Sequence, residues 1–203
     1  ILHLLMPMIK PFRQRYPEVT ISLISSESFI NLIERKVDIA IRAGNLTDST
    51  LRARLLFNSF RKVVASPAYL REHGIPQTVA ELDNHYCLGF DDSPKLNRWP
   101  VARESGELYD INWALSSNSG ETIKQLCLNG NGIACLSDYM IDREVAEGTL
   151  VEVLADHGVG DEEQVAALYL GGRRLPKRTR AVLDFLVPRL RTFLIEPKTE
   201  YSQ

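Results

Sequence analysis

The chain has 203 residues, with 24 Lys and Arg against 26 Asp and Glu, a formal net charge of -2 and a pI near 6.1. This balance provides no global basic field, so we do not expect the chain to bind DNA by itself. Hydrophobic residues make up 44% of the sequence, which is ample for one large domain or two small lobes. Three cysteines are too few for a disulfide framework, no apolar run is long enough to span a membrane, and the start of the chain lacks the order of a secretory signal, so we expect a cytoplasmic protein.

The first expected element is a helix with apolar residues at helical spacing between Leu5 and Tyr16, ending before Pro17. Pro7 and Pro11 lie four residues apart and would bend one face of this helix. Apolar side chains surround most of its circumference. One side therefore needs cover from beyond its own lobe, and an oligomer contact is the obvious candidate.

Period-two alternation and apolar runs predict the strands that follow, bounded by Gly, Pro and Asn. In chain order they cover residues 19–24, 38–41, 60–65, 86–90, 99–101, 109–114, 132–136, 150–154 and 165–170. Helices are expected over residues 29–37, 79–82, 118–130 and 137–146, and from residue 176 to about 193. The alternation of strands and helices indicates α/β layers with mainly parallel pairing, and the final helix should return to pack on the first lobe.

Residues for catalysis are scarce. The four histidines have no Ser or Cys partner in a recognisable motif, and neither a metal cluster nor a phosphate loop is found. Cys127 and Cys135 fall on expected core faces, where a free Cys usually behaves as a small hydrophobe. Gly130 and Gly132 precede a strand, whereas a dinucleotide-binding glycine motif follows one, so we interpret them as a helix stop and turn. We expect no enzyme activity, no cofactor and no metal.

Helix starts that follow strands are better candidates for binding. Asn118 and Ser119 begin a helix whose free N–H groups can hold a carboxylate or phosphate, although capping alone is the simpler interpretation. Glu121 completes the spacing of a capping box with Asn118. Ser26 and Ser28 also follow a strand and open a helix, so their hydroxyls are caps, ligand donors or both.

Two further strand ends carry candidate ligand-binding residues. Arg42 ends an apolar strand, and its guanidinium could grip a carboxylate with two parallel bonds or form a structural ion pair. Leu136 and Ser137 end another strand, and ligands of open α/β sheets bind at such ends.

Three segments resemble the effector-binding domain of LysR-type transcriptional regulators. They are D-I-A-I-R-A-G at residues 38–44, L-R-A-R-L at 51–55 and V-A-S-P-A-Y-L at 64–70, and the resemblance extends from Ile1 to about Leu194. It implies an α/β fold of two Rossmann-like lobes with an interlobe cleft, of the type 2 periplasmic-binding-protein kind. Lobe I would comprise residues 1–62 plus 169–203 and lobe II residues 63–168, with crossings near 62–65 and 169–172.

The same resemblance implies a site for a small-molecule effector at the strand-to-helix turns that face the cleft. Those turns match Ser26, Ser28, Arg42, Ala43, Gly44, Ser117, Asn118, Ser119, Leu136 and Ser137. Their basic and hydroxylic chemistry suggests a small organic anion. Arg42 and the helix start at Asn118 and Ser119 would then act on one ligand from opposite lobes.

The sequence departs from the family at its start, where the family has a strand before the first helix and this chain has none. That strand would be central in a doubly wound sheet, and its loss would expose strand edges on both sides. Either residues upstream of Ile1 are missing from the sequence, or the first lobe is damaged. Because the chain starts at Ile1 without an initiator Met, we expect a fragment of a longer protein in which a winged helix-turn-helix domain precedes Ile1. A basic run at residues 173–180 is interpreted as a solvated face, with a DNA or partner role as the alternative.

The sequence therefore predicts the ligand-sensing regulatory domain of a LysR-type regulator, with no enzyme activity. The resemblance implies a homodimer or higher homo-oligomer built with the first helix, and DNA binding only through the upstream domain, without a membrane partner. The alternative is a solute-binding protein of a transport system, which shares the two-lobed architecture.

Overall fold

The computed structural model of the chain describes residues 2–25, 32, 34–44, 51–160, 162–171 and 175–195, without the side chains of residues 2 and 191–195. The chain divides into two compact units. Unit 1 is Ile1–Ser59 with Glu163–Gln203, and unit 2 is Phe60–Glu162. The assignment of the two lobes of an effector-binding domain to particular residues stays a prediction.

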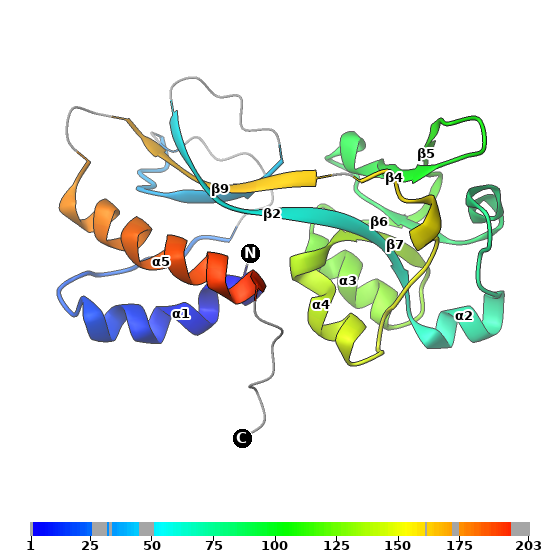
Figure 1. Ribbon diagram of the computed structural model, residues 1–203, viewed down its shortest axis with the longest axis horizontal. Helices are drawn as coiled ribbons and strands as arrows, with labels where there is room; N and C mark the ends of the chain where they lie inside the picture. Colours follow the sequence, from blue (N-terminus) through cyan, green and yellow to red (C-terminus); the bar gives the residue numbers. More distant parts are fainter. Residues whose placement is uncertain are drawn as a thin grey trace. The chain divides into compact units, whose positions relative to one another are not determined.

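The helices and strands are labelled in Figure 1. The helices are α1 (Leu2–Arg15), α2 (Pro67–His73), α3 (Gly120–Leu128), α4 (Asp138–Ala146) and α5 (Lys177–Ile195), with 3-10 helices η1 (Val79–Asn84), η2 (Pro94–Asn97) and η3 (Ala155–His157). The strands are β1 (Ala40–Ala43), β2 (Leu51–Ala65), β3 (Cys87–Gly89), β4 (Arg98–Ala102), β5 (Leu108–Asp110), β6 (Trp113–Ser116), β7 (Ile133–Ser137), β8 (Val151–Glu152) and β9 (Glu162–Leu170). None of the described helices is both long and apolar enough to cross a bilayer.

In unit 1, α1 and α5 lie side by side next to the strands (Figure 1). The apolar stripe predicted for α1 is buried, because Leu4, Met8 and Phe12 recur every fourth residue on one face. The Phe12 ring meets the Phe185 ring of α5 edge-on, with 5.2 Å between centroids. As expected, α1 ends at Arg15, ahead of Pro17, and α5 packs in unit 1 with α1.

The strand predicted over residues 19–24 is wrong, because the described backbone from 19 to 25 has no regular structure. Leu23 is 53% exposed and Ile24 is 62% exposed. A strand needs a neighbour to pair with its N–H and C=O groups, and among the described strands none pairs with this segment. Alternating residues without such a neighbour do not form a strand.

The helix predicted over residues 29–37 is not found in its described part, since residues 32 and 34–36 form turns. Lys36 has a φ of 53°, a left-handed conformation that cannot continue a right-handed helix. The rest of that prediction lies outside the described residues. The following strand, β1, pairs antiparallel with β9, from Ala40 opposite Leu168 to Ala43 opposite Val165.

In unit 2, the order β2-β7-β3-β6 forms a sheet with an apolar core on each face. Successive residues of β7 alternate between the two cores, because side chains along a strand point to opposite sides. Ile133 and Cys135 join the core under the β4–β5 hairpin, whereas Ala134 and Leu136 join the core under α3 and α4. This burial on both faces explains the nearly continuous apolar runs in the sequence.

Strand pairing is mixed, so the prediction of mainly parallel pairing is wrong. β3 runs parallel to β6 and β7, whereas β2 runs antiparallel to β7 and β8, and β4 runs antiparallel to β5. Strands that run parallel need a crossover connection, and α3 connects β6 to β7, which lie on either side of β3. The β4–β5 pair is instead joined by a tight turn with Gly106 at a φ of 85°.

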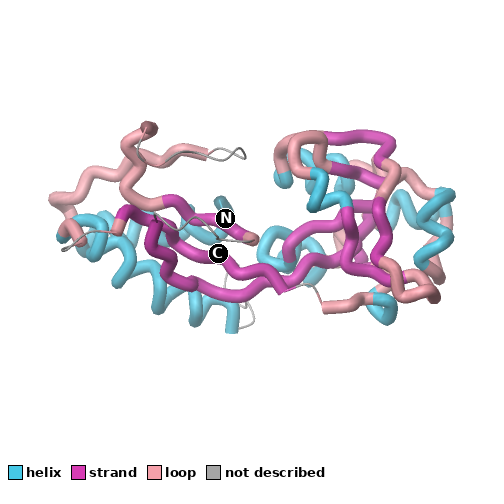
Figure 2. Tube along the Cα trace, turned by 90° about the horizontal axis from the view of Figure 1, so that it is seen from above, coloured by secondary structure: helices cyan, strands magenta, loops and turns pink. Residues whose placement is uncertain are grey.

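Three local features of the strands were not expected from the sequence. The single strand predicted over residues 109–114 is two strands, β5 and β6, which pair with β4 and β3 respectively. β2 begins at Leu51, well before the predicted Phe60, and Figure 2 shows it as a long unbroken strand. The Trp113 ring also lies directly over Gly89 of β3, where a Cβ atom would be only 2.6 Å from the ring carbon Cδ1.

Candidate functional site

The carboxyl ends of β7, β3 and β6 meet at one edge of the unit 2 sheet, because β3 runs parallel to both neighbours. Gly89 at the end of β3 is in register with Ser116 at the end of β6. Ser137 at the end of β7 lies opposite Arg61 of β2. The structure therefore brings the predicted residues at 117–119 and at 136–137 to the same sheet edge, where open α/β sheets bind their ligands.

At this edge, Ser117 and Ser119 shape the turn that leads into α3. The Ser117 backbone N–H donates to the carbonyl of Gly89 at 3.1 Å, and the Ser117 hydroxyl accepts from the Ser119 N–H at 3.1 Å. The Ser119 hydroxyl accepts from the Thr122 N–H at 3.4 Å, which makes Ser119 the N-cap of α3. The Ser117 hydroxyl accepts a bond and still has a hydrogen to donate, so this turn can offer a donor to an anion beside the positive end of α3.

The predicted capping box at Asn118 and Glu121 is wrong by one residue. Ser119 takes the cap position, and Asn118 is exposed one residue earlier. Glu121 instead pairs with Lys124 at 3.4 Å. Both Asn118 and Ser119 are good capping residues, so spacing alone does not separate them.

Both helix starts carry an acid, but Glu121 in the first turn of α3 pairs with Lys124, whereas Asp138 at the start of α4 binds backbone N–H groups. One Asp138 oxygen accepts from the Tyr139 N–H at 2.7 Å, and the other accepts from the Phe60 N–H at 3.2 Å. Ser137 makes no side-chain capping bond, and Leu136 is buried in the core under α3 and α4. A second anion would be repelled by Asp138, so the α3 start suits an anion better than the α4 start.

Arg61 and Asn97 fix the segment that runs past the end of β3. The Arg61 guanidinium donates to the carbonyls of Leu96 at 3.1 Å and Arg98 at 3.0 Å. The Asn97 carboxamide, which lies between them in sequence, pairs with both backbone groups of Phe90 at 2.7 Å. Sequence reasoning missed both residues, because the partners of Arg61 lie 35 and 37 residues away and the partner of Asn97 lies outside its own 3-10 helix.

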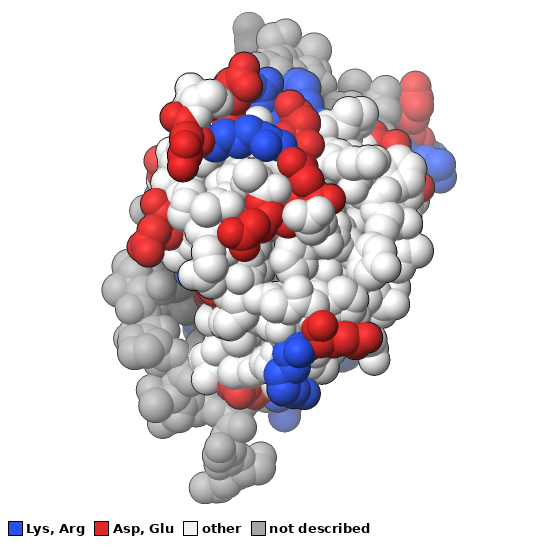
Figure 3. All heavy atoms as spheres, turned by 90° about the vertical axis from the view of Figure 1, so that its right-hand side faces the viewer, with Lys and Arg blue, Asp and Glu red and all other residues white. Residues whose placement is uncertain are grey.

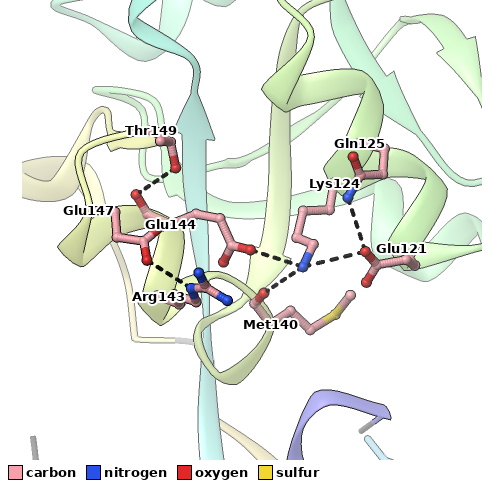
Figure 4. Close-up of polar contacts among 8 residues, drawn as sticks. All are labelled: Glu121, Lys124, Gln125, Met140, Arg143, Glu144, Glu147 and Thr149. Atoms are coloured by element: carbon pink, nitrogen blue, oxygen red, sulfur yellow. Dashed lines mark hydrogen bonds and ion pairs between the residues drawn. The ribbon is translucent and has the colours of Figure 1, made fainter. Parts of the chain in front are cut away.

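Lys124 is a buried cation that ties α3 to α4, as Figure 4 shows. Its side chain is only 2% exposed, and its ammonium lies 3.2 Å from a Glu144 oxygen and 3.4 Å from the Met140 carbonyl oxygen. Together with the Glu121 contact, these acceptors match the three donors of an ammonium group. One local signal is present, Glu121 three residues before Lys124, but that spacing normally indicates an exposed pair.

In unit 1, Arg42 lies near the end of β1, opposite Ala166 of β9. Its side chain is partly buried, and this burial lowers the pKa of the guanidinium from its ordinary value. The neighbouring acid Asp38 pairs with Arg178 of the basic run, at 3.0 Å. Ala43 is exposed, and Gly44 turns away at a φ of 96° with open space around it. Ser26 and Ser28 lie outside the described residues.

The three cysteines are buried. Burial raises the pKa of the Cys87 thiol and of the Cys127 thiol to about 12, and the Cys127 thiol donates to the Val64 carbonyl at 3.4 Å. These properties confirm the predicted core positions of Cys127 and Cys135. In the described part of the chain, no cluster of three or more His, Cys, Asp or Glu could hold a metal ion.

Comparisons of this chain with known proteins all point to the same family. Residues 1–191 match the family described as LysR substrate binding domain. The HTH-type transcriptional regulator CrgA of Neisseria meningitidis serogroup C is 49% identical over 190 residues, which cover 94% of this chain and 64% of that protein. The HTH-type transcriptional regulator DmlR of Escherichia coli K12 is 29% identical over 183 residues, which cover 89% of this chain and 59% of that protein. The chain thus spans about two thirds of the length of these relatives or less.

Solved structures agree with this assignment. The regulatory domain of CrgA superposes with a TM-score of 0.89 at 49% identity, covering 93% of each chain. Full-length AphB, a Vibrio cholerae virulence activator, superposes with a TM-score of 0.76 at 27% identity, covering 91% of this chain and 62% of that one. Both structures are of LysR-type regulators, and the expected two-lobed periplasmic-binding-protein-like fold is confirmed. The chain belongs to the LysR substrate-binding domain family.

Proposed function

We propose that this chain is the effector-sensing part of a LysR-type DNA-binding transcriptional regulator. The observation that carries the proposal is the 49% identity to the regulatory domain of CrgA over 93% of both chains. DNA binding would come from a helix-turn-helix domain outside this chain, as the names of the relatives suggest. The face of unit 2 in Figure 3 is consistent with this division, because Lys and Arg are interspersed with Asp and Glu there and form no continuous basic patch.

The alternative, a solute-binding protein for transport, receives less support because the relatives described above are transcription regulators. The same relatives give no support to an enzyme, and we propose no catalytic activity. Effector binding would then bias the arrangement of paired DNA-binding domains, which is a coupling between two distinct sites.

We propose a small organic anion as the effector. In unit 2, the start of α3 combines a positive helix end with the hydroxyls of Ser117 and Ser119. In unit 1, Arg42 supplies a guanidinium near the end of β1. A thermal-shift screen of carboxylates and amino acids tests this, because a ligand at 100 times its Kd should stabilise the fold by about 2.7 kcal/mol. Stabilisation only by cationic or neutral compounds would contradict the anion assignment.

Once a ligand is found, Arg42→Ala should weaken its binding by roughly 1.5 to 3 kcal/mol, the range for a charge-assisted hydrogen bond. Ser119→Ala should cost less, because the backbone N–H groups of the α3 start remain. Calorimetry on each variant measures both losses. Arg54→Ala is the matched control, since Arg54 forms an exposed ion pair with Asp184 in the same unit and should leave affinity unchanged. A lower melting temperature with unchanged affinity would make Arg42 a structural residue.

We also propose that the chain forms a homodimer or higher homo-oligomer through the outer surface of α1. A pocket of about 550 Å³ lies there, lined by Met6, Ile9, Lys10, Arg13, Gln14, Pro17 and Leu23. Its apolar lining is costly to leave in water. Light scattering should show at least a dimer for the native chain and a smaller species for Ile9→Glu, whereas Val159→Glu, at an exposed loop position of unit 2, should leave the size unchanged. A native monomer at tens of micromolar, taken as an order-of-magnitude working range, would contradict the proposal.

A further inference from the structure

Two histidines and two tyrosines gather in unit 2 where α2 meets the start of β3, and we call them the Tyr69 cluster: Tyr69, His73, His85 and Tyr86. The Tyr69 hydroxyl lies 3.1 Å from His85 Nδ1 and 2.9 Å from the Tyr86 backbone nitrogen. The His73 ring stacks on the Tyr69 ring, with 4.3 Å between centroids and 10° between planes. His73 also meets the Tyr86 ring edge-on at 5.5 Å.

The hydrogen bonds of the Tyr69 hydroxyl determine where the proton of His85 lies. A backbone N–H can only donate, so the hydroxyl oxygen accepts from Tyr86 and its own hydrogen points to His85. His85 Nδ1 must then be an acceptor, which requires a neutral ring with its hydrogen on Nε2. Tyr69 is only 1% exposed, so bulk water has no access to the hydroxyl and cannot replace His85 as its partner.

The Nδ1 atom of His73 has the opposite hydrogen-bonding role to that of His85. Its Nδ1 lies 3.3 Å from the backbone carbonyl oxygen of Tyr69, which can only accept, so His73 Nδ1 carries a hydrogen and donates it. A second proton on His73 would go to Nε2 and leave this bond intact. The two histidines of the Tyr69 cluster therefore respond differently to acid, and only His85 loses a hydrogen bond to Tyr69.

We propose that His85 is a pH-sensitive latch that holds α2 to the start of β3. A proton on Nδ1 removes the acceptor of the Tyr69 hydroxyl, either breaking that bond or leaving a buried hydroxyl hydrogen without a partner. Either outcome weakens the connection between α2 and β3, because Tyr69 belongs to α2 and Tyr86 directly precedes β3. Acidification would thus loosen one end of unit 2 while the rest of its core stays folded.

The surroundings of His85 favour its neutral form. Burial lowers the pKa of His85, the charge of His73 on α2 lowers this pKa further, and Glu81 on η1 opposes the two effects. Tyr69 and Tyr86 complete the polar contacts described for this side of the ring. With a pKa below the ordinary value of about 6.5, the stabilisation from His85 is fully present above that pH and is lost as the pH falls through the folded-state pKa.

The test is an NMR titration of the His85 ring in the native 203-residue chain, together with denaturant unfolding between about pH 8 and pH 5. We expect His85 to titrate below about pH 6.5, and we expect the native chain to lose stability as His85 becomes protonated. His85→Asn supplies a carbonyl acceptor that takes no proton, so it should remove this part of the pH dependence. Tyr69→Phe should move the His85 midpoint upward, because the neutral ring loses its donor.

His73→Gln is the matched control in the same cluster: it should retain the loss of stability associated with His85, with the His85 midpoint moved upward because the charge of His73 is absent. The latch is excluded if native His85 titrates at or above about 6.5. It is also excluded if His85→Asn keeps the full pH dependence of the native chain. Should a variant fail to fold, the native titration still decides, because the assignment requires a neutral His85 with a lowered pKa.

Discussion

Lys124→Ala should lower the free energy of unfolding by about 3 kcal/mol, the lower end of the range for a broken buried ion pair. The ammonium of Lys124 is buried between α3 and α4, and its removal leaves the Glu144 carboxylate, 18% exposed, without its counter-charge. The loss stays at the lower end because Glu121 is 37% exposed and keeps contact with water. Urea unfolding followed by circular dichroism measures the change.

The matched control is Glu121→Ala, which removes the more exposed partner and should cost no more than about 1 kcal/mol. Lys124→Met combined with Glu144→Met should recover most of the loss, because replacing a whole buried pair by apolar side chains is often neutral. If Lys124→Ala were as mild as Glu121→Ala, the cation would be solvated and the buried contact with Met140 would be unimportant.

Gly132→Ala should destabilise the chain by about 3 kcal/mol or more, because strain and overlap act together. Gly132 has a φ of 154°, and an added Cβ would overlap the Tyr86 carbonyl oxygen and lie 3.2 Å from Leu88 Cγ. The same Tyr86 oxygen accepts the Ile133 N–H at 2.8 Å, at the start of the β3–β7 pairing. The methyl group would therefore push β7 away from β3 in the centre of the unit 2 sheet. Thermal and urea unfolding both measure the loss.

Gly148→Ala separates conformational strain from overlap. Gly148 ends α4 with a φ of 71°, and an added Cβ there meets nothing within 4 Å. Its cost should be only the roughly 1–2 kcal/mol of a left-handed residue. Equal losses for the two variants would mean that the close approach of Gly132 to Tyr86 is relieved by small shifts.

The helices with a clear apolar stripe could be predicted, because the spacing of their apolar residues shows which face is buried. Leu4, Met8 and Phe12 of α1 share one face, and Ile123 and Cys127 of α3 share another. β7 could also be predicted, since a short apolar run between Gly132 and the helix start at Asp138 leaves room for little else. In each case the signal lies within one element.

The remaining fold depends on partners that local spacing does not reveal. Residues 19–24 alternate as well as many strands do, but no described strand pairs with them. The first half of β2 was missed because much of it is exposed and its apolar residues do not alternate cleanly. Pairing direction depends on which strands become neighbours, and β2 pairs with β7 across more than seventy residues of chain, as Val63 opposite Cys135 illustrates.

The candidate site could be predicted in position but not in its supporting contacts. Strand ends and helix starts marked Ser119 and Ser137, because caps and sheet edges have local signatures. Arg61 and Asn97 have none, and the one local signal of Lys124, its spacing from Glu121, does not reveal its partners on α4. Long polar side chains are normally exposed, so only the tertiary structure identifies those that are not.

Both tryptophans of the chain, Trp99 and Trp113, belong to unit 2. Trp99 is 1% exposed under the β4–β5 hairpin, whereas Trp113 lies over Gly89 and is 45% exposed. Tryptophan fluorescence therefore reports on unit 2 alone, while circular dichroism sums the helices of both units. A melt followed by both signals separates the unfolding of the two units without any added label, and in a ligand titration a change of tryptophan emission assigns the response to unit 2.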